Sequence, residues 1–221
     1  SNPSATASEY QKALTWWAHA LGDGVSVPLA PRLEFPPLDS PGVAFMFTDA
    51  ARENGSGHGG FTLIIEGVEP VFIYTDPRWP PEVLAALQQN VLSMPAGEGI
   101  GAVVFADALA DSLVGLRYLI VFTDSTPVVA AIQSGNSDSP QLNAIVRWLF
   151  QRRPHLQLLA LHQPGKRNGA ADGLSRTESA SVLKEAAGIG ARIERLACER
   201  DMHALALSAM QLPQLAYPSA P

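Results

Sequence analysis

Alternation between apolar runs and turn-forming residues divides the chain into strands. Five apolar runs predict five strands, at residues 43–49, 61–65, 71–74, 118–124 and 156–161. The first three are joined by short turns, which favours an antiparallel meander. The fourth is apolar throughout, as is typical of a central strand that is covered on both faces.

Segments with apolar positions at helical spacing predict helices around these strands, at residues 10–21, 82–89, 98–113, 126–133 and 140–150. The last segment has the clearest pattern, because Leu142, Ile145, Leu149 and their neighbours fall on one face. We expect Ser139 to cap this helix, with Pro140 at its first position.

This order of elements predicts an α/β fold with a five-stranded mixed sheet. Three antiparallel strands are followed by two helix-crossed strands, and helices lie on both faces. We expect residues 42–177 to form this domain, after an N-terminal helix and Pro-rich extension at 1–41. Trp16 or Trp17 would dock that helix on the domain. Residues 178–221 are expected to form a C-terminal helical extension and a Pro-rich tail.

Length and composition fit one globular domain with extensions. The 221 residues are 47% hydrophobic and 16% charged, which excludes a largely disordered chain. No apolar run approaches the roughly 20 residues that span a bilayer, and no signal peptide is visible. Cys198 is the single cysteine and has no partner for an internal disulfide. We therefore expect an intracellular protein, in a cytoplasmic particle or the nucleus, that is not secreted.

The most specific feature is a polar stretch after the fifth predicted strand. Residues 162–176 read HQPGKRNGAADGLSR, with a histidine at the strand end, a Pro-Gly turn and a carboxylate at a helix start. This closely resembles the H-x-P-G-x-x-N-x-x-A-D-x-L-S-R signature that ends the ribonuclease H domain of retrotransposon polyproteins, notably gypsy-like and tyrosine-recombinase (DIRS-like) elements. The resemblance extends over residues 43–176. It implies a ribonuclease H-like fold and a metal-dependent endonuclease that hydrolyses the RNA strand of RNA/DNA hybrids during reverse transcription.

Four carboxylates lie at predicted strand ends and helix starts, as a metal-dependent nuclease of this kind requires. Asp49 and Asp124 close two apolar strands, Glu98 begins the helix before the fourth strand, and Asp172 begins the helix after the fifth. Carboxylates gathered in one place resist ionising together, and hard divalent cations such as Mg²⁺ relieve that repulsion. Two such ions can activate a water and stabilise the leaving oxygen of a phosphodiester.

The resemblance also assigns roles to these residues. Asp49 would bridge two Mg²⁺ ions, for which Mn²⁺ is a substitute. Glu98 and Asp124 would help to bind one ion, and Asp172 would help to bind the other. His162 matches the mobile histidine that helps product leave in this family.

Simpler interpretations exist for several residues near the same elements. A Thr-Asp pair after a strand is often a turn or a helix cap, and His162 could simply hydrogen-bond to the backbone. Asp107 is the reserve carboxylate, because Gly97-Glu98-Gly99-Ile100-Gly101 departs from the Leu- and Ala-rich helix usual in these elements. His58 lies in a Gly-rich turn without a partner at metal-ligand spacing, so we expect it on a surface loop.

Candidate substrate contacts follow from positive charge and from the signature loop. They are Ser125, Arg147, Arg152, Arg153, Lys166, Arg167, Asn168 and Arg176. Ser125 could instead cap a helix, and Asn168 could brace the loop that carries Asp172. Hybrids are recognised by backbone, groove shape and 2′-hydroxyls, so base-reading residues are not required. The expected partners are an RNA/DNA hybrid and an upstream reverse-transcriptase domain of the same polyprotein, with no membrane.

The net charge and two rival functions weigh against this interpretation. A net charge of −6 is unfavourable for nucleic-acid binding, because Lys and Arg supply most of the affinity for phosphates. One rival is a catalytically inert ribonuclease H-like domain kept as a structural tether or nucleic-acid-binding module. The other is a different nuclease of the same superfamily, such as a resolvase or an exonuclease. Four intact carboxylates disfavour the first rival, and the terminal signature disfavours the second.

Overall fold

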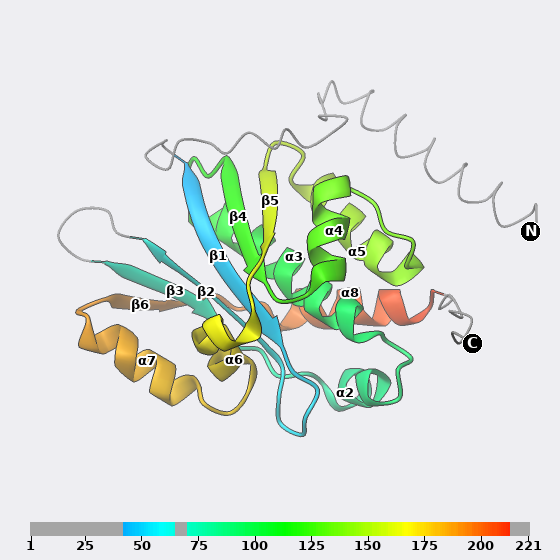
Figure 1. The fold of residues 1–221 in the computed structure, drawn as a ribbon, viewed down its shortest axis with the longest axis horizontal. Coiled ribbons are helices and arrows are strands. Elements are labelled where there is room, and N and C mark those ends of the chain that lie inside the picture. The colour runs from blue at the N-terminus through cyan, green and yellow to red at the C-terminus, as the bar shows by residue number, and fades with distance from the viewer. Residues whose placement is uncertain (1–41, 65–69, 213–221) are drawn as a thin grey trace, which may run out of the picture.

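A computed structural model describes residues 42–64 and 70–212 of the chain. At its centre lies a six-stranded mixed sheet in the order β5-β4-β1-β2-β3-β6 (Figure 1). The strands are β1 Val43–Ala50, β2 His58–Ile64, β3 Val71–Thr75, β4 Tyr118–Thr123, β5 Gln157–His162 and β6 Arg192–Arg195. β1, β2 and β3 pair antiparallel, as the short turns predict. β4 pairs parallel with both β1 and β5, and β6 pairs parallel with β3.

Helices occupy most of the connections between the strands. They are α2 Pro81–Gln88, α3 Met94–Ser112, α4 Thr126–Ser134, α5 Pro140–Arg152, α6 Gly169–Ser175, α7 Ser179–Gly188 and α8 Glu199–Met210, together with the 3₁₀ turn η1 Gly165–Arg167. The predicted cap of α5 is confirmed, because Ser139 Oγ accepts a hydrogen bond from the Leu142 amide at 3.3 Å. Across the described part of the chain, no helix is both long enough and apolar enough to cross a bilayer.

The start of α3 corrects one prediction. We expected the helix to begin at Glu98, but it begins at Met94 and places Glu98 in its second turn. Ser93 provides the physical reason, since its Oγ accepts a hydrogen bond from the Ala96 amide at 3.3 Å. A side-chain cap of this kind fixes the first turn of a helix even where glycines follow.

The two faces of the sheet are covered by different helices. Alternate residues of β1, such as Met46, are buried on one face, in the main core that α3 shares with α2, α4, α5 and α8. On the other face, α6 and α7 pack over β2 and β3. A smaller cluster of Phe72, Tyr74, Leu174, Val182 and Ala186 forms there. Figure 1 shows α6 and α7 in front of the sheet and α3 behind it. The predicted mixed α/β sheet with helices on both faces is thus confirmed.

The number of strands needs a correction, because the sheet has six rather than five. The additional strand, β6, lies within residues 178–221, which we expected to be helical. Its sequence, Arg-Ile-Glu-Arg, contains no apolar run, and it is an edge strand whose side chains are largely exposed. Such a strand forms because β3 offers a free edge, which no local pattern encodes. After it, α8 places Met202, Leu205 and Ala206 in the main core.

Three predictions lie outside the described residues. These are the helix over residues 10–21 with the docking of Trp16 or Trp17, the Pro-rich connector that follows this helix, and the Pro-rich tail at the C-terminus.

Candidate active site

Two central strands end in carboxylates at the same edge of the sheet. Asp49 lies near the C-terminal end of β1, and Asp124 directly follows β4. The two strands are parallel neighbours in which Phe47 lies opposite Phe122. Each carboxylate comes two residues after one of these partners, and side chains alternate between faces along a strand. Asp49 and Asp124 therefore lie next to each other across the two strands, on the same face as Phe47 and Phe122.

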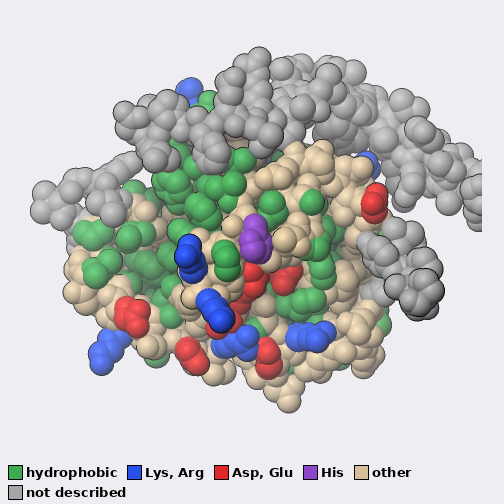
Figure 2. Space-filling view, viewed as in Figure 1, with side chains coloured by type: hydrophobic (Ala, Val, Ile, Leu, Met, Phe, Trp, Pro, Cys, Tyr) green, Lys and Arg blue, Asp and Glu red, His purple; other side chains and the backbone are tan. Residues whose placement is uncertain are grey.

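Two helices bring the other predicted carboxylates to the same place. Glu98 lies in α3 and Asp172 in α6. The negative charges of Asp124 and Asp172 both act on Asp49, and those of Asp124 and Asp49 act on Glu98. Figure 2 shows acidic side chains gathered in the middle of this face of the molecule, with Lys and Arg side chains around them. All four carboxylates thus belong to one electrostatic group, which we call the acidic cluster.

Burial alters the protonation of two members of the cluster. It raises the pKa of Asp49 to about 6, although a hydrogen bond of 2.9 Å from Ser175 Oγ to Asp49 Oδ2 opposes the rise. Burial also raises the pKa of Glu98 to about 7, with the Ser125 hydroxyl opposing the rise and the charges of Asp124 and Asp49 adding to it. The cluster therefore holds more negative charge than its surroundings stabilise.

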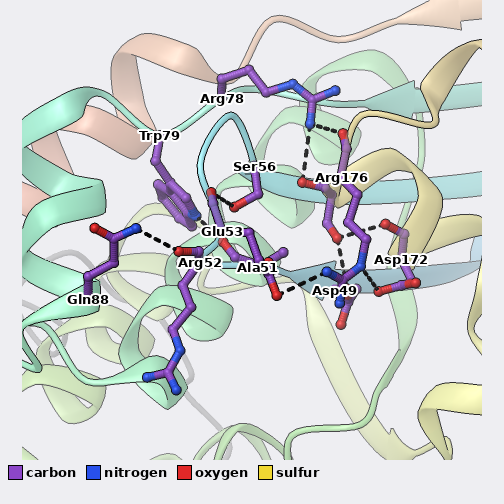
Figure 3. Close-up of polar contacts among 11 residues, drawn as sticks. Asp49, Ala51, Arg52, Glu53, Ser56, Arg78, Trp79, Gln88, Asp172 and Arg176 are labelled. Atoms are coloured by element: carbon purple, nitrogen blue, oxygen red, sulfur yellow. Dashed lines mark hydrogen bonds and ion pairs between the residues drawn. The ribbon is translucent and has the colours of Figure 1, made fainter.

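Arg176 contacts the protein's own carboxylates (Figure 3). Its Nε donates to Asp172 Oδ1 at 2.7 Å, and its Nη1 lies 3.0 Å from Glu53 Oε1. The hydrogen bonds to Asp172 and Glu53 raise the pKa of Arg176, and the bond from Arg176 lowers the pKa of Glu53. We predicted Arg176 as a substrate contact. In this structure its guanidinium is engaged by two acids, and a contact with substrate stays a prediction.

The segments that carry Glu53 and Arg176 are held by two side chains that the sequence did not single out. Trp79 Nε1 donates to the carbonyl of Ala51 at 2.8 Å, which fixes the chain just after β1. Arg78 Nη1 donates to the carbonyl of Ser175 at 3.1 Å and to that of Arg176 (Figure 3). Isolated residues of this kind produce no periodic signal, so only the fold reveals their contacts.

The signature loop lies directly against the acidic cluster. His162 ends β5 and is exposed. At Gly165 an added Cβ would lie 3.0 Å from Asp124 Oδ2, so the backbone of η1 approaches that carboxylate closely. Lys166 and Arg167 are exposed in the same turn, and neither side chain forms an ion pair with another described residue. They are therefore free cations beside a group of carboxylates.

Two predicted substrate contacts are buried instead. Asn168 is 2% exposed, and its Nδ2 donates to the carbonyl of Thr48 at 2.9 Å, so it ties the signature loop to β1. This contact fits the alternative role of Asn168 as a brace for the loop, and it leaves the side chain little surface for contact with a substrate. Ser125 is 5% exposed beside Glu98, and its Oγ forms no other hydrogen bond within the described residues. Its hydroxyl is therefore placed to hydrogen-bond with Glu98 rather than with solvent.

Arg152 and Arg153 lie at a different place from the acidic cluster. Arg152 Nη2 lies 2.9 Å from Asp107 Oδ2, and Arg153 Nε lies 2.5 Å from Asp107 Oδ1. Asp107 is a buried residue of α3, about 13 Å along the helix from Glu98 at 1.5 Å per residue. The structure thus gives these two predicted substrate contacts a structural partner, and Asp107 a structural role. Arg147 is half-buried on α5, and no described residue forms an ion pair with it.

His58 was predicted on a surface loop, and that prediction is wrong. Its side chain is fully buried, with Nε2 paired to Thr48 Oγ1, and burial lowers its pKa to about 3, so the ring is neutral. An added Cβ on Gly101 would lie 1.8 Å from His58 Cδ2. The glycines of α3 that departed from the family pattern therefore make room for neighbours. The prediction failed because the glycines around His58 are typical of an exposed turn, whereas the residue begins β2.

The donor chemistry of the acidic cluster fits a hard divalent cation, because its members are carboxylates and two of them, Asp49 and Glu98, are half-buried and repel each other. The four carboxylates lie farther apart than the ligands of a single bound metal ion. In residues 42–64 and 70–212, no group of three or more His, Cys, Asp or Glu side chains is gathered tightly enough to hold a metal. Arg176 accounts for part of this, since it holds Asp172 by an ion pair. A cation would have to draw the carboxylates together.

Comparison with known proteins gives similarities at the level of solved structures. No protein-family model and no curated protein matches the chain. The N-terminal RNase H domain of a Mycobacterium tuberculosis protein, solved as a fusion with maltose-binding protein, is 15% identical with a TM-score of 0.46. The match covers 60% of this chain and 95% of that one.

Two further structures give matches of the same kind. RNase H1 from the halophilic archaeon Halobacterium salinarum is 16% identical with a TM-score of 0.41, over 66% of this chain and 100% of that one. A foamy viral protease-reverse transcriptase in complex with dsDNA is 18% identical with a TM-score of 0.39, over 67% of this chain and 99% of that one. At such identities, the roles of the residues have to come from the chain's own geometry.

Proposed function

We propose that this chain is a ribonuclease H of a retroelement, an endonuclease that hydrolyses the RNA strand of RNA/DNA hybrids in the presence of a divalent metal. The observation that carries the proposal is the acidic cluster. Four carboxylates, at the ends of two strands and in two helices, act on one another electrostatically, and two of them are half-buried with raised pKa values. Desolvated carboxylates of this kind are found preferentially at functional sites.

Asp49, Glu98, Asp124 and Asp172 are the residues that would hold Mg²⁺, or Mn²⁺ in its place. When bound, a pair of such ions supplies an activated water and charge stabilisation for the leaving oxygen of a phosphodiester. The carboxylates need to be ionised for this. A bound cation favours the ionised form of Asp49 and Glu98, because its charge offsets the desolvation and the neighbouring negative charges that raise their pKa values.

The remaining residues of the site would act on the nucleic acid and on the shape of the site. Lys166 and Arg167 follow Gly165, whose backbone approaches Asp124, and they form no ion pair within the described residues, so they would contact the phosphate backbone. His162 is exposed at the rim, where it could reach the cleaved strand. Asn168 would keep the loop in register with β1 through its bond to the Thr48 carbonyl.

The resemblance at residues 162–176 supports an RNA/DNA hybrid as the substrate, and the net charge of the chain bears on how tightly that hybrid would bind. A net charge of −6 leaves few cations for phosphates, so the fragment alone would bind a hybrid weakly. An upstream reverse-transcriptase domain of the same polyprotein would supply most of the affinity. Such a division of labour suits an enzyme that reads backbone and groove shape rather than bases.

A second candidate function is favoured by one specific contact. The ion pair between Arg176 and Asp172, at 2.7 Å, supplies an internal cation to the acidic cluster. A ribonuclease H-like domain that has lost catalysis and serves as a tether or binding module could keep this pair, because it does not need Asp172 as a metal ligand. The two candidates differ in whether a divalent cation displaces Arg176 from Asp172.

The deciding experiment is cleavage of a labelled RNA/DNA hybrid by the full chain with Mg²⁺, with Mn²⁺ and with excess chelator. We expect metal-dependent cutting of the RNA strand that Asp124→Asn abolishes. The matched control is Asp138→Asn, an exposed acid away from the cluster, which should cut normally. Hybrid binding without any cutting would establish the inert module, and cutting in excess chelator would exclude the metal-dependent reaction.

A further inference from the structure

A ladder of aromatic rings crosses the face of the sheet that carries Asp49 and Asp124. The ring centroids of Phe122 and Phe47 are 4.8 Å apart, those of Phe47 and Phe61 are 4.9 Å apart, and those of Phe61 and Phe72 are 5.2 Å apart. Phe45 extends the ladder along β1, with its ring 6.5 Å from Phe122. We call these five residues the aromatic stripe.

Among the described residues, helices cover one half of the stripe. Phe72 is 6% exposed beneath α6 and α7, in the cluster that also holds Leu174 and Val182. Phe45, Phe47 and Phe122 are only half-buried, and they belong to neither the main core nor that cluster. Figure 1 shows no described helix in front of the upper parts of β1 and β4, and Figure 2 shows hydrophobic side chains gathered over the same strands.

An apolar surface of this kind on a folded domain usually has an occupant. We propose that the occupant is residues 10–21 of the same chain, docked through Trp17 on the open half of the aromatic stripe. In this segment Leu14, Trp17, Ala18 and Leu21 fall at helical spacing on one side. With histidine counted as neutral, the only charged residue of this segment is Lys12, so little desolvation of charge opposes docking.

The length of the chain before β1 allows this docking. Residues 22–41, which include the predicted Pro-rich connector at 27–41, separate this segment from Val43, the first residue of β1 and two residues before Phe45. In extended form this connector reaches about 60 Å at about 3.1 Å per residue. The eight residues of β1 span about 26 Å, and a helix of residues 10–21 would be about 18 Å long. The segment can therefore return onto the stripe without strain.

Docking at this place would have a consequence for the acidic cluster. Along β1, Phe45, Phe47 and Asp49 follow one another on the same face, and Asp124 follows Phe122 in the same way on β4. A segment seated on the open half of the stripe would therefore lie beside the acidic cluster and shield its apolar flank. The inference depends on the apolar surface and the chain length, so it holds whether or not the chain cuts nucleic acid.

Hydroxyl-radical footprinting of the full chain tests the proposal, because it measures the solvent accessibility of single side chains. Phe45 and Phe122 should be labelled several-fold faster in Trp17→Ala than in the unmodified chain. Trp16→Ala is the matched control, since Trp16 lies off the Leu14–Trp17–Leu21 side, and it should leave both rates unchanged. Phe72, buried under α7, is the internal standard for an intact fold. Trp17→Phe should restore most of the protection.

Two other outcomes would overturn the proposal. Equal labelling of Phe45 and Phe122 in the unmodified chain, Trp16→Ala and Trp17→Ala would show that residues 10–21 do not cover the stripe. Protection that rises with protein concentration, together with a dimer in sedimentation, would show that a second copy of the chain covers it. Faster labelling of Phe72 in Trp17→Ala would indicate a loosened fold. Trp17→Phe would then decide alone, because it preserves an aromatic ring at that position.

Discussion

The imidazole of His58 occupies the space that any side chain at position 101 would need. An added Cβ on Gly101 would lie 1.8 Å from His58 Cδ2, and the same ring pairs through Nε2 with Thr48 Oγ1. Gly101 lies about one turn after Glu98 in α3, and Thr48 precedes Asp49 in β1. His58 therefore spaces the helix that carries one carboxylate of the acidic cluster from the strand that carries another.

This contact predicts a strong coupling between the two positions. Gly101→Ala should lower the free energy of unfolding by about 1–3 kcal/mol, because overpacking forces the ring or the helix to move. His58→Ala removes the obstacle, so the double variant should cost less than the sum of the two single variants. Gly188→Ala is the control, since a Cβ there meets no atom within 4 Å. Urea unfolding of the four variants measures the coupling, and strictly additive losses would contradict the spacer role.

Glu98 predicts an unusual dependence of stability on pH. Its pKa in the folded chain, about 7, exceeds its ordinary value of 4.5. The native state therefore binds more protons than the unfolded chain between these values, and stability falls as pH rises. The contribution is fully present below pH 4.5 and is lost as pH passes 7, a loss of about 3 kcal/mol at 1.36 kcal/mol per pKa unit.

Replacing this carboxyl with a neutral amide should remove that part of the pH dependence. In excess chelator at pH 8, Glu98→Gln should be more stable than the unmodified chain, whereas at pH 4 the difference should vanish. Glu185→Gln, an exposed acid on α7, is the matched control and should behave like the unmodified chain. Thermal unfolding at both pH values measures the effect. A Glu98→Gln variant that is less stable at pH 8 would show that the carboxylate is stabilised rather than strained.

Mg²⁺ should raise the melting temperature of the chain, and Asp49→Asn should reduce that rise. A cation that binds only the native acidic cluster adds RT ln(1 + [L]/Kd), which is about 2.7 kcal/mol at a hundredfold excess over Kd. Asp49→Asn removes one ligand and also one repelling charge, so the variant can be more stable than the unmodified chain in chelator while it gains less from metal. Thermal scans with chelator and with millimolar Mg²⁺ measure both effects. An identical metal response in the two proteins would remove Asp49 from the site.

The two groups of basic residues should respond differently to substitution. Charge reversal of Lys166 and Arg167 should weaken hybrid binding about tenfold or more at low salt and flatten its salt dependence, because both are exposed in the turn next to Asp124 and form no ion pair with a described residue. Arg153→Ala should leave binding unchanged but lower the free energy of unfolding by about 2 kcal/mol or more, since it deprives the buried Asp107 of a partner. Fluorescence anisotropy and urea unfolding separate the two effects. Loss of binding in Arg153→Ala at full stability would place the interface on α5.

Elements that depend on local patterns could be predicted before the fold was known. The strands β1 and β4 can be recognised from their apolar runs, and each run is followed by a carboxylate of the acidic cluster. The cap of α5 by Ser139 is likewise local, because the hydroxyl and the amide that it accepts from are three residues apart. The candidate members of the acidic cluster follow from such strand and helix ends, together with the signature at residues 162–176.

Contacts between side chains far apart in the sequence depend on how the elements pack. Arg152 and Arg153 look like surface cations until α5 packs on α3 and brings them to Asp107. His58 looks exposed until α3 closes over it, and β6 has no signal of its own until β3 offers an edge. In each case the deciding term is the burial or pairing of groups far apart in the chain, and the free energy of that contact depends on the partner rather than on the neighbouring residues.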